Sequence, residues 1–158
     1  MDGVKIRRAR LGDAEAIEHL YRQLHPDDYT SPGARRMRRA LGVLLGNRDH
    51  SVLVAVKENQ VVGAIHVLIF RHLGRALRPM AIVENVVVDS GNRSAGVGKR
   101  LVEAAVKIAR REKCYRLSLT TNRKRKAAHR FYERLGWRRT HFCFTLPLTP
   151  ELAGRPRN

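Results

Sequence analysis

The sequence lacks several features that would assign it to common classes. Only two of its 158 residues are cysteines, Cys114 and Cys143, and they form no CxxC pair. A chain of this length buries a core without covalent staples, so both are expected to be free thiols in a reducing cytoplasm. No group of His and Cys has the spacing of metal ligands, so no metal is expected. No apolar run is long enough to cross a bilayer and no signal peptide is recognisable, so no membrane partner is expected.

Acidic and aromatic residues are also scarce. The 14 Asp and Glu residues stand against 32 Lys and Arg, which gives a net charge of +18. Such a field attracts polyanions such as phosphates and nucleic acid. An Arg-rich host composition explains the charge equally well, so both interpretations stay open. With 6% aromatic residues and no stacking or helix-turn-helix motif, a nucleic-acid partner is not favoured.

The hydrophobic pattern predicts one domain over residues 1–146 and a flexible tail over 147–158, which holds three prolines. Strands are expected over 4–9, 51–56, 61–70, 81–88, 114–121 and 140–146, and helices behind Asp13 and over 34–45, 96–112 and 125–135. This order excludes a TIM barrel and a Rossmann alternation. It predicts a mixed sheet, with antiparallel hairpins first and βαβ crossovers later.

A glycine-rich loop joins the expected strand at 81–88 to the expected helix at 96–112. Gly96 and Gly98 let the backbone approach a bulky anion, and the unpaired first-turn N–H groups of the helix point at it. Arg93 and Lys99 add positive charge. No GK[ST] follows, and Leu101 stands where a dinucleotide fingerprint has its last glycine, so neither phosphate motif applies. Alone, a GxG pattern is more often a tight turn whose glycines relieve crowding.

Two motifs in the correct order resemble those of the GNAT superfamily of N-acetyltransferases. The loop 93–98, RSAGVG, matches the family's [QR]-x-x-G-x-[GA] in full. Residues 128–137, AHRFYERLGW, look like its A-x-x-F-Y-x-x-x-G-[FW] helix, and Asn122 precedes them. The resemblance covers roughly residues 4–146. It implies an α/β (mixed α+β) fold with a mostly antiparallel sheet of six or seven strands and about four helices.

The same resemblance implies acetyl-CoA as co-substrate and no metal. Backbone groups of the strand end at 86–88 would pair with the pantetheine arm, and one N–H would polarise the thioester carbonyl. The cofactor-binding residues that it implies are Val86, Val87, Val88, Arg93, Ser94, Ala95, Gly96, Val97, Gly98, Lys99, Asn122 and Tyr132. Turn chemistry explains Asn122 equally well, and plain strand packing explains the valines.

Two residues are candidates for proton transfer. Tyr132 matches the tyrosine that in many relatives protonates the departing thiolate, and core packing beside Phe131 is its alternative. Glu84 interrupts an apolar strand and is the candidate base for the attacking amine; the alternative is that it pairs with an arginine and only positions substrate. His66, also in an apolar strand, is read as a satisfied core residue.

The resulting hypothesis is a cytoplasmic enzyme that transfers acetyl directly from acetyl-CoA to a primary amine of a small molecule or protein. The acceptor pocket is expected at 29–45 and 71–79, where arginines favour an amine that also carries an anionic group. The alternative hypotheses are an acyl-CoA-binding sensor, or a nucleic-acid-associated module, on the same fold without catalysis. The alternating segment 140–146 would allow pairing across a homodimer.

Overall fold

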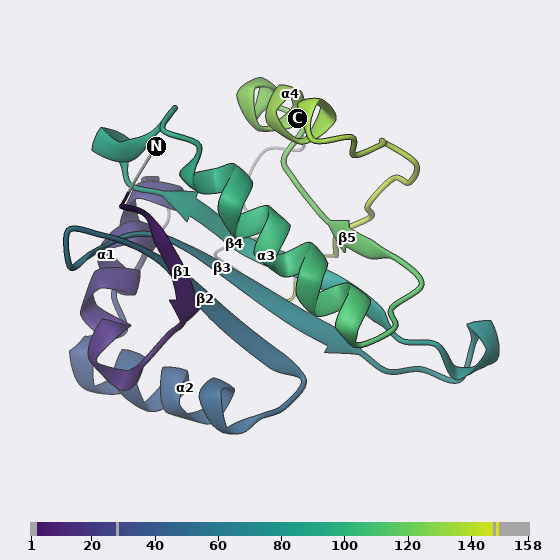
Figure 1. Cartoon of the computed structure of the whole chain (residues 1–158), viewed down its shortest axis with the longest axis horizontal. Helices are drawn as coiled ribbons and strands as arrows, with labels where there is room; N and C mark the ends of the chain where they lie inside the picture. The colour runs from purple at the N-terminus through teal and green to yellow at the C-terminus, as the bar shows by residue number, and fades with distance from the viewer. Residues whose placement is uncertain (1–2, 28, 147, 149–158) are drawn as a thin grey trace. The chain divides into compact units, whose positions relative to one another are not determined.

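The structure is a computed structural model that describes residues 3–27, 29–146 and 148 (Figure 1). The chain separates into two compact units, Met1–Leu119 and Thr120–Asn158, and each is described by itself. The first unit holds the sheet and three of the α-helices. The second holds one α-helix and the segment that follows it.

The sheet of the first unit has five strands in the order β1-β2-β3-β4-β5. Their bounds are β1 Lys5–Arg8, β2 His50–Lys57, β3 Gln60–Phe70, β4 Met80–Val88 and β5 Leu117–Leu119. The first four strands pair antiparallel, and β5 runs parallel to β4. A parallel neighbour needs a crossover, which is the helix α3, Val97–Arg111. The predicted mixed, mostly antiparallel sheet is confirmed.

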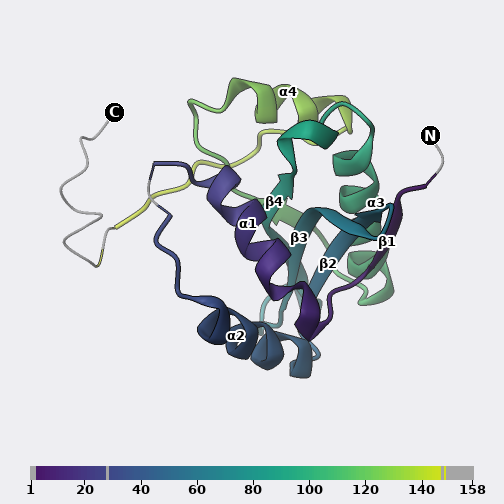
Figure 2. The ribbon, with the colours of Figure 1, turned by 90° about the vertical axis from the view of Figure 1, so that its left-hand side faces the viewer.

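Helices cover both faces of this sheet (Figure 2). On one face lie α1, Ala14–Leu24, and α2, Ala34–Gly46, and on the other lies α3. The apolar stripe of α1 buries Ile17 and Leu20, each with 1% exposure, in a cluster with Val54 of β2 and Ala64 of β3. This burial follows from the 3.6-residue spacing of the stripe.

Gly63 of β3 lets α3 approach the opposite face closely. A Cβ at this position would lie 3.0 Å from the carbonyl oxygen of Val87, 3.1 Å from Leu101 Cδ1 and 3.3 Å from Val97 Cγ1. Val97 and Leu101 are both fully buried, and they anchor the first turns of α3 next to the end of β4. The start of α3 is therefore fixed by packing rather than by a capping side chain.

The second unit contains α4, Lys126–Arg134. Gly136, predicted to stop this helix, has a φ of 82° and donates its N–H to the Glu133 carbonyl at 2.9 Å. The ring of Tyr132 lies 5.0 Å from that of Phe131 and 5.6 Å from that of Trp137, centroid to centroid. These aromatic contacts are local to the helix and the residues directly after it.

Two strand predictions need correction. The strand expected over 140–146 is wrong, because these residues form no strand in the structure. Alternation defines two faces, but a strand also needs a partner in a ladder, and sequence alone does not supply one. The run predicted over 114–121 shortens to Leu117–Leu119. The described residues thus form five strands instead of six or seven. Most of the expected tail, 147 and 149–158, lies outside the described residues. No helix among the described residues is long and apolar enough to cross a membrane.

Candidate active site

A β-bulge in β4 shapes the centre of the candidate site. Between the pairs Ala64–Val87 and His66–Glu84, β3 advances by two residues while β4 advances by three. The extra residue is accommodated at Asn85, whose φ of 53° is left-handed. Because of the bulge, Glu84 and Val87 face the same side of the sheet, although residues three positions apart face opposite sides in a regular strand.

The bulge lies close to Tyr21 of α1. Burial raises the pKa of Tyr21 to about 12, and the neighbouring Asn85 side chain opposes this rise. Asn tolerates the left-handed conformation better than most residues because its short polar side chain bonds locally. The sequence analysis did not predict the bulge at Asn85. An Asn inside a run of Val and Ile is the signal that could have indicated it.

Among the described residues, one edge of β4 has no partner strand from the bulge to the end of the strand. The β4–β5 ladder joins only Ala81–Val83 to Leu117–Leu119. From Glu84 to Val88, no described strand pairs with that edge of β4. Main-chain groups there are able to bond an extended ligand, as a further strand would. This is the region, Val86 to Val88, that the sequence motif assigned to the pantetheine arm.

Glu84 lies on the α1 side of the sheet, directly opposite His66. Partial desolvation raises the pKa of its carboxyl above the ordinary value for glutamate. No ion pair to Glu84 is found among the described residues, so the alternative in which it pairs with an arginine has no support there. Glu84 is exposed, and its role as a proton acceptor stays a prediction.

The loop after β4 ends in a left-handed turn at the start of α3. Ser94 has a φ of 67° and Gly96 a φ of 74°. Gly96 is the N-cap of α3, which has no capping side chain and no acidic residue in its first turn. The first-turn N–H groups therefore lack a side-chain acceptor, and with the helix dipole they favour an anion.

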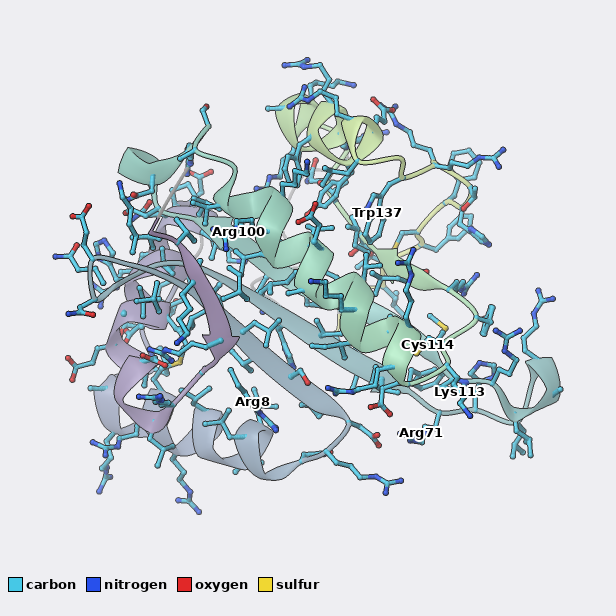
Figure 3. All side chains as sticks on the ribbon, in the orientation of Figure 1. Arg8, Arg71, Arg100, Lys113, Cys114 and Trp137 are labelled. Atoms are coloured by element: carbon cyan, nitrogen blue, oxygen red, sulfur yellow. The ribbon has the colours of Figure 1, made fainter. Side chains whose placement is uncertain are left out.

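A small hollow of 190 Å³ lies at this helix start, lined in part by Gly96, Lys99 and Arg100. Arg100, which the loop motif does not include, projects from the first turns of α3 (Figure 3). Lys99 is paired loosely with Glu103, at 3.9 Å between exposed groups. Arg93 instead donates its Nε–H to the Val88 carbonyl at 3.3 Å. Two cations thus flank the helix start, and a third lies against the end of β4.

The remaining predicted residues, Asn122 and Tyr132, belong to the second unit. The side-chain oxygen of Asn122 accepts the N–H of Lys124 at 2.8 Å, and its carbonyl accepts from His129 Nε2 at 3.0 Å. The turn role of Asn122 is therefore present, and its contact with a cofactor stays a prediction. Tyr132 lies in α4 between the rings of Phe131 and Trp137, so the packing role is present as well, and its role as an acid stays a prediction.

Comparison with known proteins decides the family. The family model described as "Acetyltransferase (GNAT) family" matches residues 14–137, well over half of the chain. This chain belongs to the GNAT acetyltransferase family. The match includes both motifs that carried the resemblance, and the predicted family is confirmed.

Curated relatives and solved structures agree with this GNAT assignment. The chain is 32% identical over 102 residues to "Glucosamine 6-phosphate N-acetyltransferase" of Trypanosoma brucei brucei, covering 65% of this chain and 64% of that protein. It is 35% identical over 95 residues to "Aminoalkylphosphonate N-acetyltransferase" of Salmonella typhimurium, covering 60% and 61%. Both matches span slightly less than two thirds of those relatives. A solved "Putative acetyltransferase" from Agrobacterium tumefaciens is 31% identical with a TM-score of 0.82, covering 90% of this chain and 99% of that one. The predicted family and fold are confirmed.

Proposed function

We propose that this GNAT protein transfers the acetyl group of acetyl-CoA directly to a primary amine. The observation that carries the proposal is the continuity of three features along one segment of chain. Glu84 stands at the bulge, the unpaired β4 edge follows it, and the left-handed loop then leads into the start of α3. A carboxyl that would act as the base, an unpaired strand edge that would bind an extended arm and a helix start that would bind an anion thus succeed one another within residues 84–100.

The residues divide the donor side of the reaction between them. Main-chain groups of Val86–Val88 would bond the pantetheine arm, and one N–H would stabilise charge on the thioester oxygen. The N–H groups of residues 94–99, with Lys99 and Arg100, would hold the pyrophosphate. Arg93 would join them with its terminal guanidinium N–H groups, because only its Nε–H is bonded to the Val88 carbonyl.

The acceptor amine must be neutral before it attacks the thioester carbon. Glu84 would take the proton that the amine loses, directly or through a water. As the new C–N bond forms and the C–S bond breaks, the leaving thiolate would take a proton from the hydroxyl of Tyr132. This proton transfer is itself uphill, since thiols ionise near 8.5 and phenols near 10, and reprotonation of the phenolate from solvent at neutral pH would complete it. No covalent enzyme intermediate is needed, and neither Cys114 nor Cys143 has a part in it.

We further propose that the acceptor carries a phosphate or phosphonate beside its amine. The names of two relatives, for glucosamine 6-phosphate and for aminoalkylphosphonate, support this, as does the net charge of +18. The structure narrows the set of arginines that are available to bind this anionic group. Arg71 is already paired with Asp49 and Glu112, at 3.0 and 3.5 Å. Arg35 and Arg38 of α2, by contrast, line a hollow of 360 Å³.

Two further properties remain proposals. The cytoplasm is the proposed compartment, supported by the two free thiols, Cys114 and Cys143. A homodimer is still a prediction, and it no longer has a strand at 140–146 to support it.

Thermal unfolding with acetyl-CoA tests the donor side. Ligand at 100 times its Kd should add about 2.7 kcal/mol of stability. Gly96→Asp should abolish this shift, because a carboxylate would stand at the anion site and a non-glycine residue would be strained at the left-handed N-cap. An unshifted wild-type melting temperature would contradict both the enzyme and the sensor hypotheses. A normal shift in Gly96→Asp would contradict the placement of the pyrophosphate.

A further inference from the structure

We propose that Gln23, on the last turn of α1, is a positioning residue for the acetyl-CoA loop. Its side chain holds the turn Asp89–Asn92, through which β4 enters the loop that would bind the pyrophosphate. This inference rests on the proposed function. It adds a residue from a helix that carries neither family motif.

Both ends of the Gln23 amide are used. Its Nε2 donates to Asp89 Oδ1 at 2.9 Å, and its Oε1 accepts the backbone N–H of Ser90 at 2.9 Å. These bonds join residues 66 and 67 positions apart in the chain. The orientation of the amide follows from its partners, because a carboxylate only accepts and an N–H only donates.

Asp89 links Gln23 to the rest of the turn through further hydrogen bonds. Its second oxygen, Oδ2, accepts from the Gly91 N–H and from Asn92 Nδ2, each at 3.1 Å. Its own N–H donates to the Val62 carbonyl of β3 at 2.9 Å, which ties the turn to the sheet. The hydrogen bond from Gln23, followed by that from Asn92, lowers the pKa of Asp89, so the carboxylate is the form that the turn requires.

The turn determines how the chain enters the loop. Residues Ser90–Asn92 form a short 3₁₀ helix, and the chain becomes extended at Arg93 before the left-handed residue Ser94. A change at Asp89 or Ser90 therefore shifts the N–H groups that follow. Loss of the Gln23 amide should loosen the loop and weaken acetyl-CoA binding, while the reacting groups at β4 keep their places.

Only a primary amide of this length satisfies both partners. Alanine removes both bonds. Glutamate at position 23 has the same shape, but its ionised carboxylate would face the Asp89 carboxylate and lose the donor. When protonated, it regains an O–H donor for Asp89 and keeps an acceptor for Ser90. Gln23→Glu should therefore bind acetyl-CoA in a pH-dependent way that a simple packing role does not produce.

The experiment measures Kd for acetyl-CoA, with KM and kcat, for Gln23→Ala and Gln23→Glu. Gln60 is an exposed glutamine at the β2–β3 turn, so Gln60→Ala and Gln60→Glu are matched controls. We expect Gln23→Ala to raise Kd and KM about tenfold, corresponding to about 1.4 kcal/mol, with kcat within about twofold of wild type. Gln23→Glu should bind poorly at pH 8 and approach wild type near pH 5.

His19, whose Nε2 lies 3.1 Å from Gln23 Nε2, is the other titratable group in these contacts. The same pH series on wild type and Gln23→Ala shows any change in Kd that comes from protonation of His19, because neither protein has a carboxyl at position 23.

A second variant protects the test against a folding defect. Asp89→Asn keeps the shape of the turn, and in the double variant with Gln23→Ala the loss of binding should be smaller than the sum of the two single losses, because both changes affect the Gln23–Asp89 bond. An unchanged Kd in Gln23→Ala, a fall in kcat alone, or additive effects in the double variant would each overturn the proposal. If wild type itself binds no acetyl-CoA, the proposed function fails instead.

Discussion

His66 Nε2 lies 2.8 Å from His50 Nδ1 across the β2–β3 pair, and the two rings stack with their centroids 5.0 Å apart. One nitrogen must donate and the other must accept, so at least one of these two rings is neutral. Burial, followed by the charge of His50, lowers the pKa of His66. The sequence predicted a satisfied core histidine. The structure shows His66 satisfied by a histidine partner that the sequence did not indicate, and half-buried instead of in the core.

This pair predicts how stability changes with pH. A histidine whose pKa is lower in the folded state than its unfolded value near 6.5 binds fewer protons when folded, so stability is full above that value and falls as pH drops through it. Wild type should lose melting temperature between pH 7.5 and 5.5. His66→Gln should lose less over this range, because glutamine does not titrate. Equal losses in both proteins would show that the pair does not contribute.

Glu84→Gln should lower kcat by about 10²–10⁴-fold while acetyl-CoA binds normally, because the amide keeps the shape but accepts no proton. In wild type, the raised pKa of Glu84 should place the acid limb of the rate profile above the range of an ordinary glutamate. Steady-state rates from pH 5 to 9 check both statements. Glu58→Gln, in the exposed β2–β3 turn, is the control. A retained kcat in Glu84→Gln would remove this residue as the base.

Tyr132→Phe should lower turnover with little change in acetyl-CoA affinity, because only the hydroxyl is lost and the ring contacts with Phe131 and Trp137 remain. The rate with an acetyl donor whose leaving thiol is more acidic should fall less, since such a thiolate needs less protonation. Rates for the two donors, measured in wild type and Tyr132→Phe, separate an acid from a packing residue. Equal losses with both donors would assign Tyr132 to packing.

Sequence patterns predicted the elements that local periodicity and short motifs define. The helix expected over 96–112 is observed as Val97–Arg111, and the strand expected over 81–88 as Met80–Val88. The bonds from Gln23 to Asp89 and Ser90 were not predicted, because a polar residue on a helix does not reveal which distant segment it meets. The strand at 140–146 failed for a related reason, since its alternation is local and a ladder partner is not. The helices, strands and loop of the site were thus predictable from the sequence. The tertiary contacts that position them were not.

Gly63→Ala should destabilise the protein by about 1–3 kcal/mol, because the new Cβ would lie 3.0 Å from a backbone oxygen that has little room to move. Gly46→Ala, at the end of α2, is the matched control, since nothing lies within 4 Å of its added Cβ. Urea unfolding of the two variants compares them directly. Comparable stabilities would mean that α3 shifts easily on the sheet, contrary to the anchoring of its first turn by Val97 and Leu101.

Thiol release from acetyl-CoA, with matched pairs of amines as acceptors, tests the central claim most directly. The pairs are glucosamine 6-phosphate with glucosamine, and 2-aminoethylphosphonate with ethylamine, and mass spectrometry identifies the N-acetylated products. We predict release well above the rate without acceptor, with the phosphorylated or phosphonylated member of a pair preferred. A preference for the member without a phosphate or phosphonate would contradict the proposed acceptor class. No release above the acceptor-free rate with any amine, from a protein that acetyl-CoA stabilises, would contradict the enzyme itself and leave a sensor.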